Sequence, residues 1–146
     1  MDLDQFFPYQ LARLAEQVSL ATAQVYQTRF ALGRDEWRVM AALAQASEMK
    51  TSDVLGRTTM EKMQVSRALA KLERDGLVER SPDPEDGRAY LVRLRPPGLA
   101  LYRKIVPMVQ AREEYLLSDL SEAERKVLSA AFAKVGERAR QLIRHG

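Results

Sequence analysis

The chain has 146 residues, 46% of them hydrophobic and 29% charged, and carries a net charge of +3. This composition is ordinary for a folded protein with a buried core, and the mild positive charge permits nucleic acid as a partner without requiring it. Cysteine is absent and His145 is the only histidine, which excludes thiol redox sensing, Cys-ligated zinc and His-based triads. No apolar stretch reaches ~18 residues, and the N-terminus carries two acidic residues, Asp2 and Asp4, unlike a signal peptide. We therefore expect a soluble cytoplasmic protein with no cofactor and no membrane partner.

The first two helices are predicted from apolar spacing and charge. Over residues 7–29, apolar side chains recur every three or four positions, as in a long amphipathic helix. Gly33 is expected to end this helix. Acidic residues then open a second helix over residues 35–46, where negative charge is favourable at a helix start.

A short helix, a turn and a longer helix are predicted next. The short helix covers residues 52–57 and the longer one residues 60–75, which Gly76 ends by supplying a left-handed conformation. The candidate N-caps are hydroxyl residues: Thr51 or Ser52 for the first helix and Thr59 for the second.

A hairpin is predicted directly after Gly76. The strand-like runs 77–81 and 89–94 flank residues 82–88, which are dense in Pro, Asp and Gly. Residues 96–98, Pro-Pro-Gly, end the second strand.

The chain then returns to helix. A helix is expected over residues 99–117, with Pro107 as a site for a kink. Ser121 and Glu124 fit the capping box of a last helix. Its apolar seam runs from Leu128 to Leu142.

This order is typical of a winged helix-turn-helix, whose second helix enters the major groove of DNA. On the wheel of residues 60–75, four apolar residues face the core and the polar residues Gln64, Arg67 and Lys71 lie opposite, with Arg74 beside them. Taken alone, this polar face is better explained as that of an ordinary surface helix. The core-facing residues are Val65, Ala68, Leu69 and Leu72.

The hairpin changes the balance between these two interpretations. Arg88 lies at its turn-rich tip, where a cation can reach the minor groove. Asp86 is close enough in sequence to hold that arginine or a neighbouring basic side chain in position. An ordinary hairpin with a mixed-charge tip is the alternative. Both features together, in this order, favour DNA binding.

Residues 36–40, 65–80, 82–88 and 94–98 resemble the multiple-antibiotic-resistance regulator (MarR) family. The resemblance covers essentially the whole chain, and the helix-into-wing stretch is its specific part. It implies a mainly α protein with a small β-hairpin wing: a winged helix-turn-helix between N- and C-terminal helical dimerisation arms. One departure is Gly87, where many members carry a second arginine beside the one matching Arg88.

The resemblance also implies a domain organisation and partners. An N-terminal dimerisation helix covers residues 1–33, the DNA-binding domain residues 34–97, and C-terminal helices that complete the dimerisation region residues 98–146. Such a protein is a homodimeric regulator, most often a repressor, of a pseudo-palindromic double-stranded operator. A small organic effector releases it, and an aromatic or phenolic carboxylate or its coenzyme A thioester suits the residues here. Independently, the apolar seams of the first and last helices are too long for one small winged helix to cover, which favours a dimer. Packing of both seams within the monomer is the alternative.

These inferences assign two sets of site residues. The expected DNA contacts lie on the short helix (residues 52–57), on the helix over residues 60–75, which we call the recognition helix, and on the wing: Ser52, Lys62, Gln64, Val65, Ser66, Arg67, Lys71, Arg74, Asp86 and Arg88. The expected effector-lining residues are rings, a methionine and an arginine: Phe7, Tyr9, Tyr26, Arg29, Trp37, Met40 and Tyr102. For most of the second set, an ordinary place in the core is the alternative.

Two other classes of protein fit the sequence less well. An enzyme would need a carboxylate pair such as Glu85 with Asp86 or Glu113 with Glu114. Adjacent residues do not converge on a substrate, so we do not expect the protein to be an enzyme. A helical dimerising protein without sequence-specific DNA binding is the remaining alternative. It does not explain basic residues on both the helix and the wing.

Overall fold

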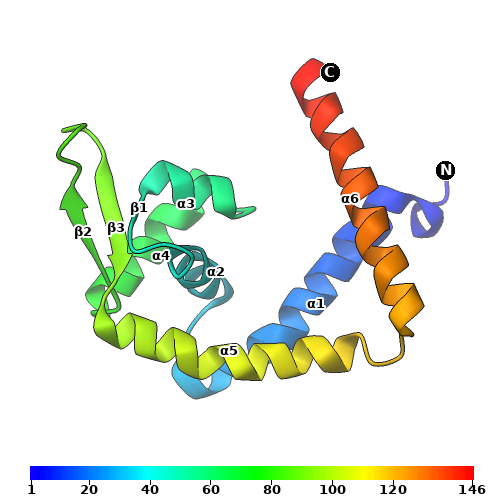
Figure 1. Cartoon of the computed structure of the whole chain (residues 1–146), viewed down its shortest axis with the longest axis horizontal. Helices are drawn as coiled ribbons and strands as arrows, with labels where there is room; N and C mark the ends of the chain where they lie inside the picture. The colour runs from blue at the N-terminus through cyan, green and yellow to red at the C-terminus, as the bar shows by residue number, and fades with distance from the viewer. The chain divides into compact units, whose positions relative to one another are not determined.

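The computed structural model describes residues 1–146, which form two compact units, residues 1–110 and 111–146 (Figure 1). The mainly helical fold with a small sheet is confirmed. No helix is both long and apolar enough to cross a bilayer. The elements, in chain order, are η1 (Leu3–Gln5), α1 (Phe7–Phe30), α2 (Arg34–Leu43), β1 (Met49–Lys50), α3 (Thr51–Arg57), α4 (Lys62–Arg74), β2 (Val78–Pro82), β3 (Tyr90–Leu94), α5 (Pro96–Leu116) and α6 (Glu122–His145).

The end of α1 differs from the prediction. Ala31, not Gly33, stops the helix in the left-handed conformation, with φ of 51°. An alanine in this conformation costs about 1–2 kcal/mol. The reversal brings Leu32 into the core, where it is 3% exposed, and this burial offsets the cost. Gly33 instead serves as the N-cap of α2.

The predicted hydroxyl caps were also wrong. Lys50 precedes α3 without a side-chain cap, because β1 runs directly into that helix. The N-cap of α4 is Glu61, which forms a capping box with Gln64. The Gln64 Oε1 accepts a hydrogen bond of 2.8 Å from the Glu61 backbone N–H.

The sheet has three antiparallel strands in the order β1-β3-β2. The hairpin of β2 and β3 was predicted, and its register pairs Val78 with Leu94 and Pro82 with Tyr90. Strand β1 was not predicted, because two residues are too few for a periodic signal. Its pairing with β3 ties the segment before α3 to the base of the wing.

Helix α4 lies over a core shared by α2, α3 and the sheet. Its four predicted core residues are all buried, at 3% exposure or less. They pack in one cluster with the buried side chains of the neighbouring elements: Met40 and Leu43 from α2, Val54 from α3, Val78 from β2 and Val92 from β3.

The start of α5 approaches the backbone at the step from α4 into the wing. The Leu77 carbonyl accepts a hydrogen bond of 2.9 Å from the Arg95 N–H. A Cβ placed on Gly98 would lie 2.1 Å from the same carbonyl oxygen, so only glycine fits. Helix α5 then continues through Pro107 as one helix.

Two helices present exposed apolar side chains. On the first half of α1, they are between 37% and 52% exposed: Phe7, Leu11, Leu14 and Val18. Helix α6 begins with the predicted capping box of Ser121 and Glu124 and buries no residue. Five of its large apolar residues are between 43% and 84% exposed: Val127, Phe132, Val135, Leu142 and Ile143.

Gly98→Ala should lower the free energy of unfolding by about 1–3 kcal/mol, since the new Cβ must push α5 from the Leu77 carbonyl. Gly56→Ala is the matched control, because that glycine also lies in a helix but has nothing within 4 Å of its added Cβ. It should stabilise the protein by about 0.5–1 kcal/mol. Chemical denaturation of both variants measures the difference, and equal midpoints would contradict the steric argument.

Candidate nucleic-acid interface

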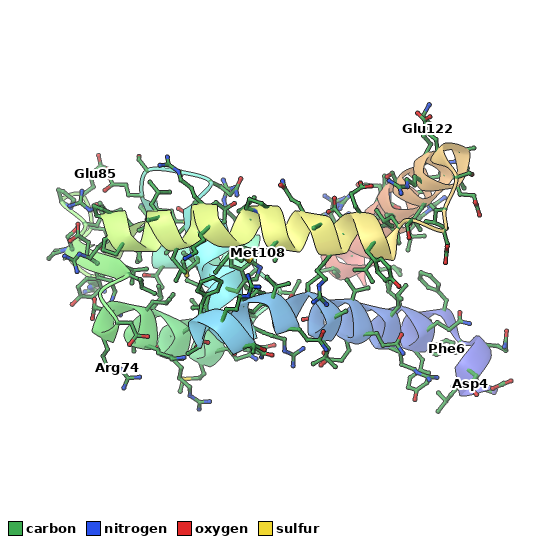
Figure 2. The ribbon with its side chains drawn as sticks, turned by 90° about the horizontal axis from the view of Figure 1, so that it is seen from below. Asp4, Phe6, Arg74, Glu85, Met108 and Glu122 are labelled. Carbon is green, nitrogen blue, oxygen red and sulfur yellow. The ribbon has the colours of Figure 1, made fainter.

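One face of α4 carries exposed side chains toward solvent. Lys62, Met63 and Ser66 begin it, and Arg67 and Arg74 continue it at helical spacing. Arg67 and Arg74 have no ion pair or hydrogen-bond partner in the chain. Figure 2 shows Arg74 projecting away from the body of the molecule. The cations of this face are therefore available to a partner.

Two residues predicted to contact DNA are occupied within the protein. Val65 is 1% exposed and belongs to the core, so its assignment as a DNA contact was wrong. The side-chain carbonyl of Gln64 accepts a hydrogen bond in the capping box of α4. The wheel placed Gln64 correctly away from the core but could not show this competing hydrogen bond.

Lys71 is held by α2 and by the end of α1. Its Nζ lies 2.7 Å from the Glu36 Oε1 and 3.4 Å from the Ala31 carbonyl oxygen. The Glu36 side chain is only 13% exposed. Burial raises the pKa of Glu36. Hydrogen bonds from Lys71 and from backbone N–H groups have the opposite and larger combined effect, so the pKa of Glu36 lies below its usual range. Lys71 thus helps to fix the position of α4, and its contact with DNA stays a prediction.

Ion pairs also connect α4 with the wing. The Arg80 guanidinium of β2 donates two hydrogen bonds, of 3.1 and 3.3 Å, to the Glu73 carboxylate of α4. These bonds hold the pKa of Glu73 below its usual range. Arg93 pairs with Glu79 across the hairpin. The Arg80–Glu73 pair therefore links α4 directly to the base of the wing.

The wing base and tip are shaped by two aspartates. Asp83 is 5% exposed, and its Oδ2 lies 3.7 Å from the Lys50 Nζ of β1. The Asp86 Oδ1 accepts a hydrogen bond of 3.1 Å from the Arg88 backbone N–H. Asp86 thus shapes the turn, whereas its predicted role of holding the arginine side chain is not what this contact does. The Arg88 side chain is exposed and has no partner in the chain.

The remaining predicted DNA contact, Ser52, is exposed near the start of α3. Figure 1 shows the hairpin of β2 and β3 extending from the body that contains α3 and α4. The unpaired cations of α4 and of the hairpin therefore lie on two exposed features, the face of α4 and the wing tip. This arrangement suits a duplex contacted in two grooves.

Three of the predicted effector-lining residues form a stack. The Trp37 ring lies between Tyr26 and Tyr102, with ring centroids 5.3 and 5.6 Å apart. Burial raises the pKa of Tyr26 and outweighs the opposing effect of the Arg38 and Arg34 charges. The stack joins α1, α2 and α5 and is the part of the predicted site that the fold brings together.

The other four predicted effector-lining residues are not part of this stack. Met40 is fully buried in the core. An Arg29 guanidinium nitrogen lies 4.0 Å from the sulfur of Met108, which Figure 2 shows between α1 and α5. Phe7 and Tyr9 lie at the opposite end of α1 from Tyr26, about 25 Å away at the rise of a helix. The prediction grouped them by residue type, which does not report distance.

Two arginines beside the stack were missed. Arg34 donates to the Glu16 carboxylate at 2.7 Å and lies 3.3 Å from the Ser19 hydroxyl. Arg38 donates to the same hydroxyl at 2.9 Å. Their spacing of four on a helix that also carries Trp37 was the available signal. A groove of about 480 Å³ opens beside them between α2 and the α3–α4 turn, lined by Trp37, Arg38, Ala41, Ala42, Gln45, Arg57, Thr58 and Thr59.

Residues 32–98 match a family model described as a winged helix DNA-binding domain. An HTH-type transcriptional regulator of Mycobacterium bovis is 30% identical over 129 residues, covering 82% of this chain and 88% of the relative. Two further relatives are matched over less of their length: the regulator YdgJ of Bacillus subtilis (28% identical over 71% of this chain and 63% of its own) and the repressor IacR of Pseudomonas putida (26% over 60% and 53%).

A crystal structure of a MarR/EmrR family transcriptional regulator from Acinetobacter sp. ADP1 is 28% identical and superposes with a TM-score of 0.86, covering 97% of this chain and 99% of that one. With the geometry above, these matches define a transcription regulator with a winged-helix DNA-binding domain. The chain belongs to the MarR family of winged helix-turn-helix regulators.

The position of Lys71 predicts an unusual salt response. Lys71→Met should leave the slope of the logarithm of DNA affinity against the logarithm of salt concentration unchanged, because Lys71 neutralises Glu36 rather than a phosphate. Lys62→Met, an exposed lysine at the start of the same helix, should reduce that slope by about one.

Folding stability provides the second measurement. Lys71→Met should cost about 1–3 kcal/mol of unfolding free energy by leaving Glu36 without its partner, and adding Glu36→Gln should restore part of the loss. A slope reduced by one in Lys71→Met would show a phosphate contact instead.

Proposed function

We propose that this chain is a repressor that binds a pseudo-palindromic operator as a homodimer and leaves it when a small aromatic carboxylate binds. The observation that carries the proposal is the set of cations without intramolecular partners on the exposed face of α4 and at the wing tip. Several other cations of the reading head, by which we mean α2 to β3 (residues 34–94), are already paired, among them Lys71 and Arg80.

For DNA recognition, α4 enters the major groove with Arg67 directed at base edges, where a guanidinium can bind guanine in a bidentate manner. Arg88 reaches the adjacent minor groove from the wing tip. Lys62, Arg74 and Ser52 contact phosphates and set the register. In support, a mutant of the regulator MarR of E. coli, 24% identical with a TM-score of 0.77, has been crystallised in complex with operator DNA.

Repression is supported by two relatives. IacR of Pseudomonas putida is named as a repressor. So is the homoprotocatechuate degradative operon repressor of E. coli, which is 26% identical over 96 residues, 66% of this chain. A regulator that occupies a promoter as a dimer blocks transcription without any catalytic group.

A second copy of this chain is proposed to cover the exposed apolar faces of α1 and α6. Each face carries four or more large apolar side chains, which a monomer would leave in water. We therefore assign residues 1–33 and 98–146 to dimerisation and residues 34–97 to DNA binding. A two-fold dimer presents two copies of α4 to half-sites about one helical turn apart.

The effector is proposed to bind beside the Trp37 stack. An aromatic ring packs against Trp37 in the adjoining groove, whose volume of about 480 Å³ suits a single-ring acid. Its carboxylate pairs with Arg38 in competition with Asp35, whose Oδ1 lies 3.7 Å from the Arg38 Nη1. Among structural neighbours, the DNA binding of Bordetella bronchiseptica BpsR, 24% identical with a TM-score of 0.83, is regulated by 6-hydroxynicotinic acid.

Release from DNA requires that the effector bind a DNA-incompetent arrangement more tightly. Helix α2 is the connecting element, since Trp37 on the groove side directly follows Glu36, the partner of Lys71 on α4. A small rotation of α2 that accommodates the ligand would shift Glu36 and with it the recognition helix.

The DNA proposal is tested by selecting genomic fragments with the wild-type protein and measuring their binding at two salt concentrations. We expect two protomers per operator and an affinity that falls steeply with salt. Arg67→Ala should relax base preference, and Arg88→Ala should weaken binding evenly across operator variants. A flat salt response would refute DNA binding, and equal losses on every variant from both changes would refute the division of roles.

The effector proposal is tested by fluorescence, because Trp37 is the only tryptophan. Addition of 4-hydroxybenzoate should quench its emission and weaken operator binding. Arg38→Gln should reduce the affinity for this acid about tenfold, the value of a lost charge-assisted hydrogen bond. The neutral amide 4-hydroxybenzamide is the control and should bind both proteins equally; the same loss for both compounds would count against a carboxylate contact.

A further inference from the structure

The recognition helix exposes one large apolar side chain. Met63 is 63% exposed at the second position of α4. Within residues 32–98, Tyr90 on the hairpin is the only other exposed large hydrophobic residue. A single exposed methionine is common on protein surfaces, so its neighbours decide what it can do.

Those neighbours place Met63 on the face directed toward DNA. Ser66 and Arg67 follow it by three and four residues, which puts all three side chains on one side of the helix, with the Cβ atoms of Met63 and Arg67 about 5–6 Å apart. Gln64 is engaged in the capping box and Lys71 in its ion pair with Glu36. The first turns of a recognition helix are the part that reaches base edges.

The chemistry of this face is restricted. Arg67 can donate to the O6 and N7 atoms of guanine, whereas the Met63 thioether has no hydrogen to donate and its sulfur is only a weak acceptor, so Met63 contacts a base mainly through dispersion and burial. In the major groove, the thymine 5-methyl group is the apolar feature that a base edge presents. Methionine suits it because its unbranched chain adapts to the position of the methyl group.

We propose that Met63 determines specificity by packing against a thymine methyl group within about two base pairs of the guanine read by Arg67, a distance set by the helical spacing of the two residues. Each half-site of the operator then contains this thymine. The inference rests on the proposed DNA binding and adds a base identity that hydrogen-bonding residues on the helix do not specify.

The test replaces thymines by deoxyuridine, which keeps every hydrogen bond and removes only the methyl group. Operators selected from genomic fragments by the wild-type protein are substituted one position at a time, symmetrically in both half-sites. At one position, wild-type affinity should fall about fourfold per half-site, the effect of burying one methyl group. The remaining positions should change little.

Three variants of the full chain complete the experiment. Met63→Ala should lose affinity for the thymine operator and become insensitive to deoxyuridine at that position. Met63→Leu should retain part of the sensitivity, because leucine is also apolar. Ser66→Ala, the control on the same face, should respond to deoxyuridine as the wild type does. The salt slope should stay unchanged in Met63→Ala, since no phosphate contact is removed.

Two results would overturn the inference while leaving DNA binding intact. One is a wild-type affinity that does not change with deoxyuridine at any position. The other is full sensitivity retained in Met63→Ala. Failure to select any genomic fragment would instead refute the proposed DNA binding itself, and the thymine contact with it.

Discussion

The burial of one face of α4 is the constraint on which the reading head depends. Val65, Leu69 and Leu72 are almost completely buried against α2, α3 and the sheet. Because a helix turns about 100° per residue, fixing this face fixes which side chains can point outward. Gly98 adds a second constraint, because only a residue without a Cβ lets the start of α5 lie against the Leu77 carbonyl. The exposed cations are therefore positioned by packing rather than by charge.

Polar contacts then divide the cations of the reading head into two groups. Lys71 and Arg80 neutralise Glu36 and Glu73, and so hold α4 to α2 and to the wing. Arg67, Arg74 and Arg88 have no such partner. A count of basic residues overestimates the DNA contacts, because an ion pair that fixes a helix removes a charge from the surface.

Helix α2 contacts both proposed sites. Along α2, Glu36 binds the lysine of the recognition helix, Trp37 stacks between two tyrosines, and Arg38 reaches the groove. A ligand that changes the position of α2 must therefore change the support of α4. Such coupling needs no long pathway, since the two contacts are made by consecutive residues of one rigid element.

Local patterns in the sequence determined the order of helices, the hairpin and the buried face of α4, because periodicity and turn residues act over a few positions. They also indicated the family. Only the tertiary structure decided the roles of Gln64 and Lys71, the pairing of β1, the stop at Ala31 and the position of Arg34 and Arg38 beside the aromatic stack. Each of these depends on a partner or a burial site distant in the sequence, or on competition between local hydrogen bonds, and neither is encoded by spacing alone.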